Sequence, residues 1–215
     1  MFRRITSIPV LGFLLRIANT YAYSGDYAAS SKFAGIGRWG KAFGPPLFFS
    51  VLLTTGTIWP ELMRALHCRE LNFSHASDFI QKPGALIGST MPSLLGFGIG
   101  VYALIFGLAE PFVKQFKELI TKERQSGALS HGSELMLNSD LAFPLIVLVT
   151  SLAIGTIQQA HQGNPTLIIA TWIFFWYSLI SMIEMISVIF RLAENSLLDK
   201  GKNQEKSTES KEELE

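Results

Sequence analysis

The longest uncharged stretch of the chain, residues 141–183, reads LAFPLIVLVTSLAIGTIQQAHQGNPTLIIATWIFFWYSLISMI. Its 43 residues are about twice the length that one transmembrane helix needs to cross a bilayer. Polar residues interrupt it at 158–165, where Gly163, Asn164 and Pro165 are typical of a turn followed by a helix start. We therefore predict two membrane spans, about 141–160 and 165–190, joined by a tight turn.

Two further stretches, 42–60 and 83–109, are uncharged and long enough for one crossing each. They predict spans at about 43–62 and 84–109. The composition agrees, because only 16% of the residues are charged, against about 25% in a soluble domain. We predict an all-α integral membrane protein. Its expected architecture is a four-helix bundle over 43–192, with additional amphipathic helices at the membrane surface or in the cytoplasm.

Lysine and arginine residues are unevenly distributed over the predicted loops. Of the 18, all but three lie in the N-terminal arm (1–42), in the loop at 110–140 or beyond residue 190. The positive-inside rule therefore predicts that both termini and this loop are cytoplasmic, in a multi-pass protein of a bacterial inner membrane. The tail, 193–215, is rich in charge and poor in large apolar residues, so we expect it to be disordered.

The arm carries apolar residues over 5–17 that are flanked by arginines, a pattern typical of an interfacial amphipathic segment. Its glycine-rich run, 35–41, matches G-x-G-x-x-G, but a membrane span follows where a nucleotide-binding unit would need a strand and a phosphate-binding helix. We interpret the run as a flexible hinge. Trp39 and Trp59, at the two ends of the first span, are predicted membrane-interface anchors.

Small residues recur along the second span at Gly96, Gly100, Ala103 and Gly107, with spacings that place them on one helical face. Small residues allow helix backbones to approach closely in lipid, where little hydrophobic force brings helices together. Two interpretations remain open. The face packs against another helix of the same chain, or it forms a close contact between subunits or lines a pore.

Glu184 is the one formally charged residue well inside the predicted spans, and Ser181 and Ser187 flank it as a polar stripe. A carboxylate at the centre of a span costs about 2.5–3.5 kcal/mol, so we expect Glu184 to face protein or water. Three roles are open: a structural latch to a cytoplasmic arginine or a backbone donor, part of an ion path, or a proton relay. No second acid, lysine or histidine is predicted inside the spans, which disfavours a proton-coupled transporter.

The polar residues form no convincing catalytic or metal-binding pattern. His67, Cys68 and His75 lie in one loop, but they offer too few ligands for a typical zinc site. We therefore predict no metal, no cofactor, no enzymatic activity and no direct contact with nucleic acid. Cys68 is the single cysteine, so no intrachain disulfide forms. We interpret it as an ordinary helix-end residue, with an intersubunit disulfide or a redox role as alternatives.

The run MPSLLGFGIGVYALIFG at 91–107 resembles a segment of small uncharacterised bacterial membrane proteins. The architecture is similar to that of membrane subunits of bacterial anti-phage defence systems, which implies a subunit that oligomerises or permeabilises the membrane under the control of a soluble partner. We interpret the chain as an oligomeric channel or pore-forming effector that is controlled by a cytoplasmic partner or ligand. The alternative is a non-conducting membrane anchor or sensor that recruits a soluble protein. The expected partners are the lipid bilayer, further copies of the chain and that soluble protein.

Overall fold

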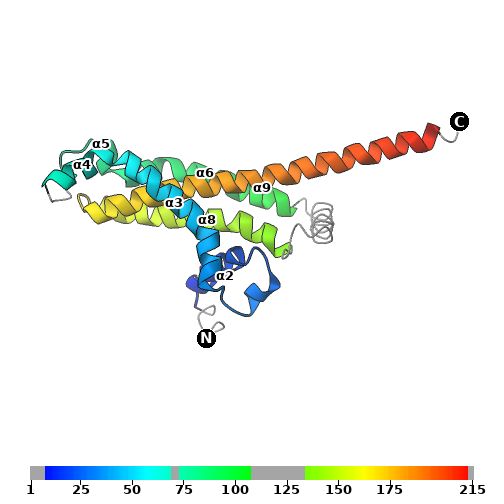
Figure 1. Ribbon diagram of the computed structural model, residues 1–215, viewed down its shortest axis with the longest axis horizontal. Helices are drawn as coiled ribbons and strands as arrows, with labels where there is room; N and C mark the ends of the chain where they lie inside the picture. The colour runs from blue at the N-terminus through cyan, green and yellow to red at the C-terminus, as the bar shows by residue number, and fades with distance from the viewer. Residues whose placement is uncertain (1–7, 69–72, 108–133, 213–215) are drawn as a thin grey trace.

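The computed structural model describes residues 8–68, 73–107 and 134–212, and every regular element in these ranges is a helix. The all-α prediction is therefore confirmed for them. The elements are α2 (Leu11–Ala22), the short 3-10 helix η1 (Tyr27–Ser30), α3 (Ile36–Thr57), α4 (Trp59–Cys68), α5 (Asp78–Gln81), α6 (Pro83–Gly107), α8 (Glu134–Ala160) and α9 (Pro165–Glu212) (Figure 1). α2 includes the second half of the amphipathic segment predicted over 5–17, whereas residues 5–7 and most of the predicted loop at 110–140 lie outside the described residues.

Within the described ranges, three helices are long and apolar enough to cross a membrane. They are α6 over Pro83–Gly107, α8 over Leu135–Ala160 and α9 over Pro165–Arg191, which match three of the predicted spans. Only 11% of the most apolar window of α6 is buried in the chain, so most of its apolar surface needs lipid or another protein to cover it. These helices indicate an integral membrane protein.

The first predicted span, 43–62, is not one straight helix. α3 begins at Ile36, continues through Pro45 and Pro46 and ends at Thr57, after which α4 bends away by 71°. The two helices make a fourth candidate span only when they are counted together. Pro60 explains the bend, because it has no N–H to continue the helical hydrogen bonds of α3. The glycine-rich run, predicted as a hinge, forms the first turns of α3.

The tail was predicted to be disordered, but α9 continues as a helix to Glu212 (Figure 1). The span supplies a formed helix, so each further residue needs only to propagate it. The tail contains no proline and many good helix formers, which favours this propagation. α8 likewise begins at Glu134, earlier than predicted, so Asp140 lies inside a helix that is long and apolar enough to cross a membrane.

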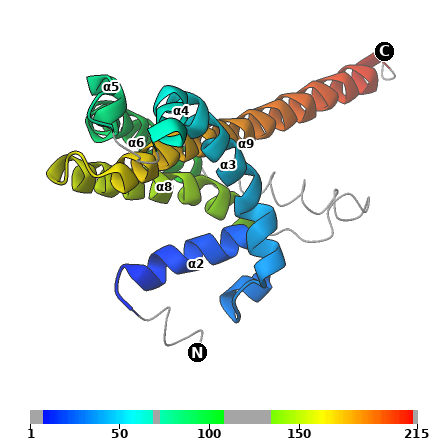
Figure 2. The ribbon, with the colours of Figure 1, turned by 60° about the vertical axis from the view of Figure 1, so that its left-hand side comes forward.

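α8 and α9 form an antiparallel helical hairpin at the centre of the molecule (Figure 2). Asn164 caps α9, because its side-chain oxygen accepts hydrogen bonds from the backbone N–H groups of Thr166 and Leu167. α6 packs along α8 and to a smaller extent on α9, whereas α3 packs on α9. In the described residues α3 and α6 share no extensive contact, so the closed ring of a four-helix bundle is not established.

At the end of the molecule that holds the α8–α9 turn, named the hairpin end, buried side chains bond to backbone. The Gln158 side chain donates to the carbonyl of Gln81 (3.0 Å) and accepts from the N–H of Gly84 (3.1 Å). The indole N–H of Trp172 donates to the carbonyl of Ile80 (3.1 Å). The first N–H groups of a helix lack intrahelical partners, so these bonds fasten α5 and the start of α6 to the hairpin.

At the opposite end, named the arm end, the N-terminal arm folds into a compact unit. The buried side chain of Asn19 donates to the carbonyls of Ala29 (3.0 Å) and Lys32 (3.0 Å) and accepts from the N–H of Ala34 (2.8 Å). One amide on α2 therefore holds the whole loop that follows it.

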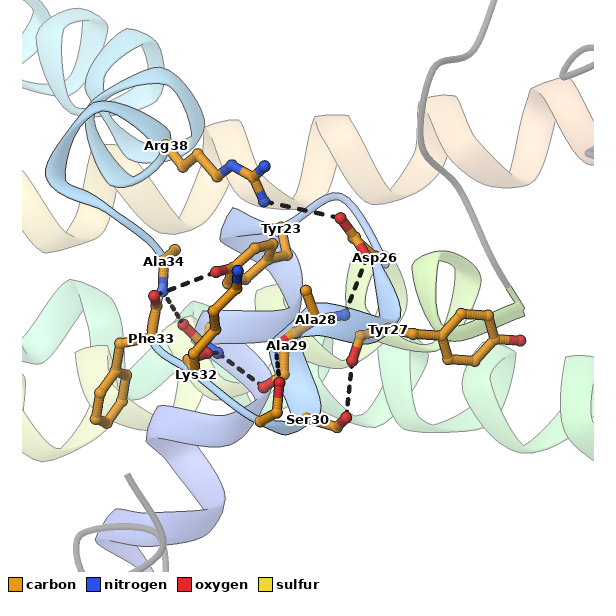
Figure 3. A network of polar contacts seen from close by, with 12 residues as sticks. Tyr23, Asp26, Tyr27, Ala28, Ala29, Ser30, Lys32, Phe33, Ala34 and Arg38 are labelled. Atoms are coloured by element: carbon orange, nitrogen blue, oxygen red, sulfur yellow. Dashed lines mark hydrogen bonds and ion pairs between the residues drawn. The ribbon is translucent and has the colours of Figure 1, made fainter. Parts of the chain in front are cut away.

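A second set of contacts ties the same loop to the start of α3 (Figure 3). The Tyr23 hydroxyl donates to the carbonyl of Phe33 (3.2 Å), and the Arg38 guanidinium lies 4.4 Å from the centroid of the Tyr23 ring. Arg38 also lies 3.9 Å from the carboxylate of Asp26. The arm and the first turns of α3 consequently form one unit.

Candidate functional site

A cavity of about 460 Å³ lies at the arm end, where α2, α3, α8 and α9 meet. Its volume falls within the range of small-molecule sites, about 300–1,000 Å³. Four charged side chains line it: Lys41 from α3, Asp140 from α8, and Glu184 and Arg191 from α9. The remaining wall is formed by hydroxyl-bearing and mostly apolar residues, namely Tyr21, Ser24, Ser187, Ala42, Met136, Pro144, Ile183 and Val188.

The hairpin brings the two acids of the cavity together. Asp140 lies 20 residues before Ala160, the last residue of α8, and Glu184 lies 19 residues after Pro165, the first residue of α9. At 1.5 Å per residue, both are about 30 Å from the turn. Since the helices are antiparallel, the two carboxylates lie at the same level. That distance is also about the thickness of a bilayer's hydrocarbon core.

Asp140 corrects the expectation that no second acid lies inside the spans. It was missed because the uncharged stretch begins one residue later, at Leu141. The usable signal was the apolar run Leu135–Leu137, which the structure places in the first turn of α8. An apolar run directly before an acid indicates that the helix begins ahead of the acid and includes it.

Glu184 bonds to the N-terminal arm. The Tyr21 hydroxyl donates a hydrogen bond to its Oε2 at 3.1 Å and so joins α2 to α9. Burial and the neighbouring Glu184 raise the pKa of Tyr21 above its usual value, so the hydroxyl keeps its proton and stays a donor. This contact is named the latch, and the three roles of Glu184 stay predictions. The partner is a tyrosine and not the expected arginine or backbone group.

The Tyr21 ring is itself held by aromatic neighbours. It stacks on Phe143 of α8, with centroids 4.3 Å apart, and lies 5.5 Å from the ring of Phe43 of α3. The latch therefore sits where the arm, α3 and both hairpin helices meet.

The predicted polar stripe around Glu184 divides between two environments. Ser187 lines the cavity and donates to the carbonyl of Ile183 (2.9 Å). Ser181 is fully buried, does not line this cavity, and its hydroxyl has no hydrogen-bond partner among the described residues. The structure thus brings Glu184 and Ser187 together and separates Ser181 from them.

The small-residue face of α6 is left uncovered by the part of the chain that the structure describes. Gly96, Gly100, Ala103 and Gly107 are all exposed, and a Cβ added at any of the three glycines would meet nothing within 4 Å. Among the described residues, none packs against this face. Contact between subunits and pore lining stay as predictions.

The face of α6 that does pack lies on the opposite side of the helix. At Gly98 an added Cβ would collide with Leu145 of α8, and at Gly84 it would collide with the backbone of Gly155. Gly98 and Gly100 differ by two residues, which is about 200° around a helix. Periodicity alone detected a glycine face but could not show which face the chain covers.

The two tryptophans lie at opposite ends of α3. Trp39, in its first turns, stacks on Phe43 with centroids 4.9 Å apart, and Trp59, at the start of α4, is 49% exposed. Anchoring at the membrane interface stays a prediction.

His67 and His75 are both exposed, and the described residues contain no group of three or more potential metal ligands. The side chain of Cys68 lies outside the described set.

Comparison with known proteins identifies no relative of the chain. No protein-family model, no curated protein and no solved structure matches the chain. The likeness to membrane subunits of anti-phage defence systems stays a prediction from the architecture.

Proposed function

We propose that the protein is an oligomeric membrane channel whose copies associate through the small-residue face of α6. The observation that carries the proposal is that the described residues leave this face uncovered while they pack the opposite face of the same helix. In lipid, a glycine-lined face gains close van der Waals contact only from another helix. A second copy offers such a face.

Conduction would require several copies. Inside one copy the space between the hairpin helices is filled by large side chains, among them Leu148, Trp172 and Met185, each at most 1% exposed. A path for ions would therefore form between copies, next to the α6 faces, and not through the hairpin.

The arm end would face the cytoplasm, as the distribution of basic residues favours. α3 would transmit events at the arm to the membrane, because one helix runs from the arm at Ile36 to the far end of the span at Thr57. A soluble partner or ligand that displaces the arm would then change the packing of α3 on α9. A pore opened in this way would permeabilise a bacterial inner membrane, the activity expected of a defence effector.

Planar-bilayer recording of the purified full chain tests the proposal with two matched variants. Gly100→Leu adds bulk to the uncovered face, so we expect a folded protein that elutes as a monomer and conducts no current. Gly98→Leu adds the same bulk to the packed face, so we expect loss of thermal stability. Normal current from a monomeric Gly100→Leu variant would contradict the proposal. The absence of current from both the wild type and the Tyr21→Phe variant, which lacks the latch, would contradict it as well.

Glu184→Gln separates the latch from an ion path in the same recordings. A latch residue affects how often the channel opens, whereas a residue in the path affects the ratio of cation to anion permeability. We expect a change in opening and an unchanged reversal potential in a salt gradient.

A non-conducting anchor or sensor is the second candidate, and the length of α9 favours it. The helix continues past its membrane-spanning part, which ends at Arg191, to Glu212 and offers a long surface beyond the span. The two candidates are distinguished by cross-linking bacterial cells that express either the full chain or a chain ending at residue 192. The proteins that co-purify with each chain are then compared. A soluble protein retained only by the full chain, together with silent bilayer recordings, would favour the anchor.

A further inference from the structure

We propose that the charged cavity at the arm end binds an ammonium–phosphate zwitterion, the phosphoethanolamine head group of a membrane lipid. The site does not depend on conduction, since an anchor would carry the same cavity. Three observations carry the proposal: the unpaired charges of the cavity, their arrangement, and their level along the hairpin.

The cavity holds two acids and two bases that do not pair with each other. The ion pairs found in the described part of the chain join Arg38 to Asp26, Arg64 to Glu61 and Lys82 to Asp78. None of them includes a charged residue of the cavity wall. A space of about 460 Å³ separates charges of both signs, so a ligand of both signs can bridge them.

The acids and bases occupy different parts of the wall. Asp140 and Glu184 are half-buried on facing helices, whereas Lys41 and Arg191 are exposed. A primary ammonium has three N–H donors, so it can donate to both carboxylates at once. The Tyr21 hydroxyl bonds to one oxygen of Glu184 and leaves the other for the ammonium. Phosphate oxygens accept charge-assisted hydrogen bonds from lysine and arginine. The ammonium would therefore lie deeper in the cavity and the phosphate at its rim.

The level of the acids points to a lipid as the source. Both lie about 30 Å from the hairpin turn, the thickness of the hydrocarbon core, and so at the head-group level of one leaflet. Pro144 and Ile183 belong to the same wall and lie closer to the hairpin turn than the acids, in the membrane-spanning parts of α8 and α9. They offer an apolar surface to the glycerol and the first methylenes of a lipid whose head group occupies the cavity.

Lipid retention in native mass spectrometry tests the proposal on the purified full chain. The protein is equilibrated with vesicles of phosphatidylethanolamine, phosphatidylcholine or phosphatidylglycerol that have the same acyl chains. We expect wild type to retain phosphatidylethanolamine about tenfold more strongly than phosphatidylcholine, whose quaternary ammonium has no N–H to donate. Equal retention of the two lipids would overturn the proposal.

Two double variants assign the two ends of the head group. Asp140→Asn with Glu184→Gln should abolish the preference for phosphatidylethanolamine. Lys41→Gln with Arg191→Gln should weaken the retention of phosphatidylethanolamine and phosphatidylglycerol alike, because both carry the phosphate. The control, Lys82→Gln, removes an exposed base at the hairpin end whose partner Asp78 is also exposed, and it should leave the retention of both lipids unchanged. A preference that survives loss of both acids would contradict the site.

A methylation series on the wild type needs no variant to fold. Adding one, two and three methyl groups to the lipid amine removes its N–H donors one at a time, so retention should fall at each step. A flat series would overturn the proposal. Free phosphoethanolamine, added in competition with the lipid, identifies the source. Failure to compete supports the lipid, whereas competition at equal concentration would overturn the lipid as the source.

Discussion

The two ends of the α8–α9 hairpin are fastened by different chemistry. At the hairpin end, Gln158 and Trp172 bond directly to the backbone of α5 and the start of α6. At the arm end, the same two helices border a charged cavity, and the latch joins the arm to α9 through one hydrogen bond. Side chain-to-backbone bonds fix one arrangement, whereas side chains that face a cavity can exchange partners. The comparison assigns a fixed end and an adjustable end to one membrane domain.

Gln158→Ala would break the fixed end and has the largest expected effect on stability. It removes the partners of the Gly84 N–H and the Gln81 carbonyl. An unsatisfied buried group costs about 1–3 kcal/mol, although polar contacts between membrane helices average about 0.6 kcal/mol. We expect a loss of about 2 kcal/mol, measured by thermal unfolding in detergent. Gln159→Ala, at the exposed neighbour, is the control, and an equal loss there would show that the buried bonds do not fix this end.

Gly25→Ala tests the arm end of the hairpin, because we expect it to detach the arm from α8. Gly25 has φ +73° and approaches α8 so closely that a Cβ would collide with the backbone of Met136. The left-handed conformation alone costs an alanine about 1–2 kcal/mol. We expect faster hydrogen exchange over α2 and little change in the unfolding temperature of the spans.

The control for that variant is Gly37→Ala, at a helical position of α3 where an added Cβ meets nothing within 4 Å. Alanine there should be neutral or stabilise by about 0.5–1 kcal/mol. If both variants released the arm equally, the contact of Gly25 with α8 would not be what holds it.

Tyr21→Phe has the smallest expected effect, because it removes only the latch hydroxyl and keeps the ring on Phe143. We expect docking of the arm to weaken by about 1 kcal/mol, seen as increased exchange of the α2 amides. Tyr27→Phe, at a ring that is 62% exposed, serves as the reference. Identical exchange in the two variants would mean that the latch does not restrain the arm.

Much of the membrane domain could be predicted from the sequence because bilayer thickness sets the length of an apolar helix. α6, α8 and the span of α9 follow from this one constraint. The ends of α3 and α9 do not follow from it. Pro60 bends the chain within an apolar stretch, and the polar tail continues a helix that the span has already formed.

The candidate site could be predicted only in part, because its members come from distant segments. Glu184 was recognisable as a charge inside a span. Its partner Tyr21 is 163 residues away, and no local pattern sets the position of the arm against α9. The three backbone partners of Asn19 are likewise set by the folded loop and not by any local motif. On α6, glycine spacing is the same for a packed face and for an uncovered one, so only the packing of α8 separates Gly98 from Gly100.

Disulfide cross-linking at the uncovered face of α6 tests the central claim most directly. Cys68 is the single native cysteine, so Cys68→Ser provides a background free of thiols. In that background Gly100→Cys should form covalent dimers rapidly in native membranes under a mild oxidant, and Gly98→Cys, at the face packed on Leu145, should form few. Rapid dimers of Gly100→Cys alone are the predicted result. No dimers at Gly100→Cys, or equal dimers at both positions, would contradict association of copies through this face.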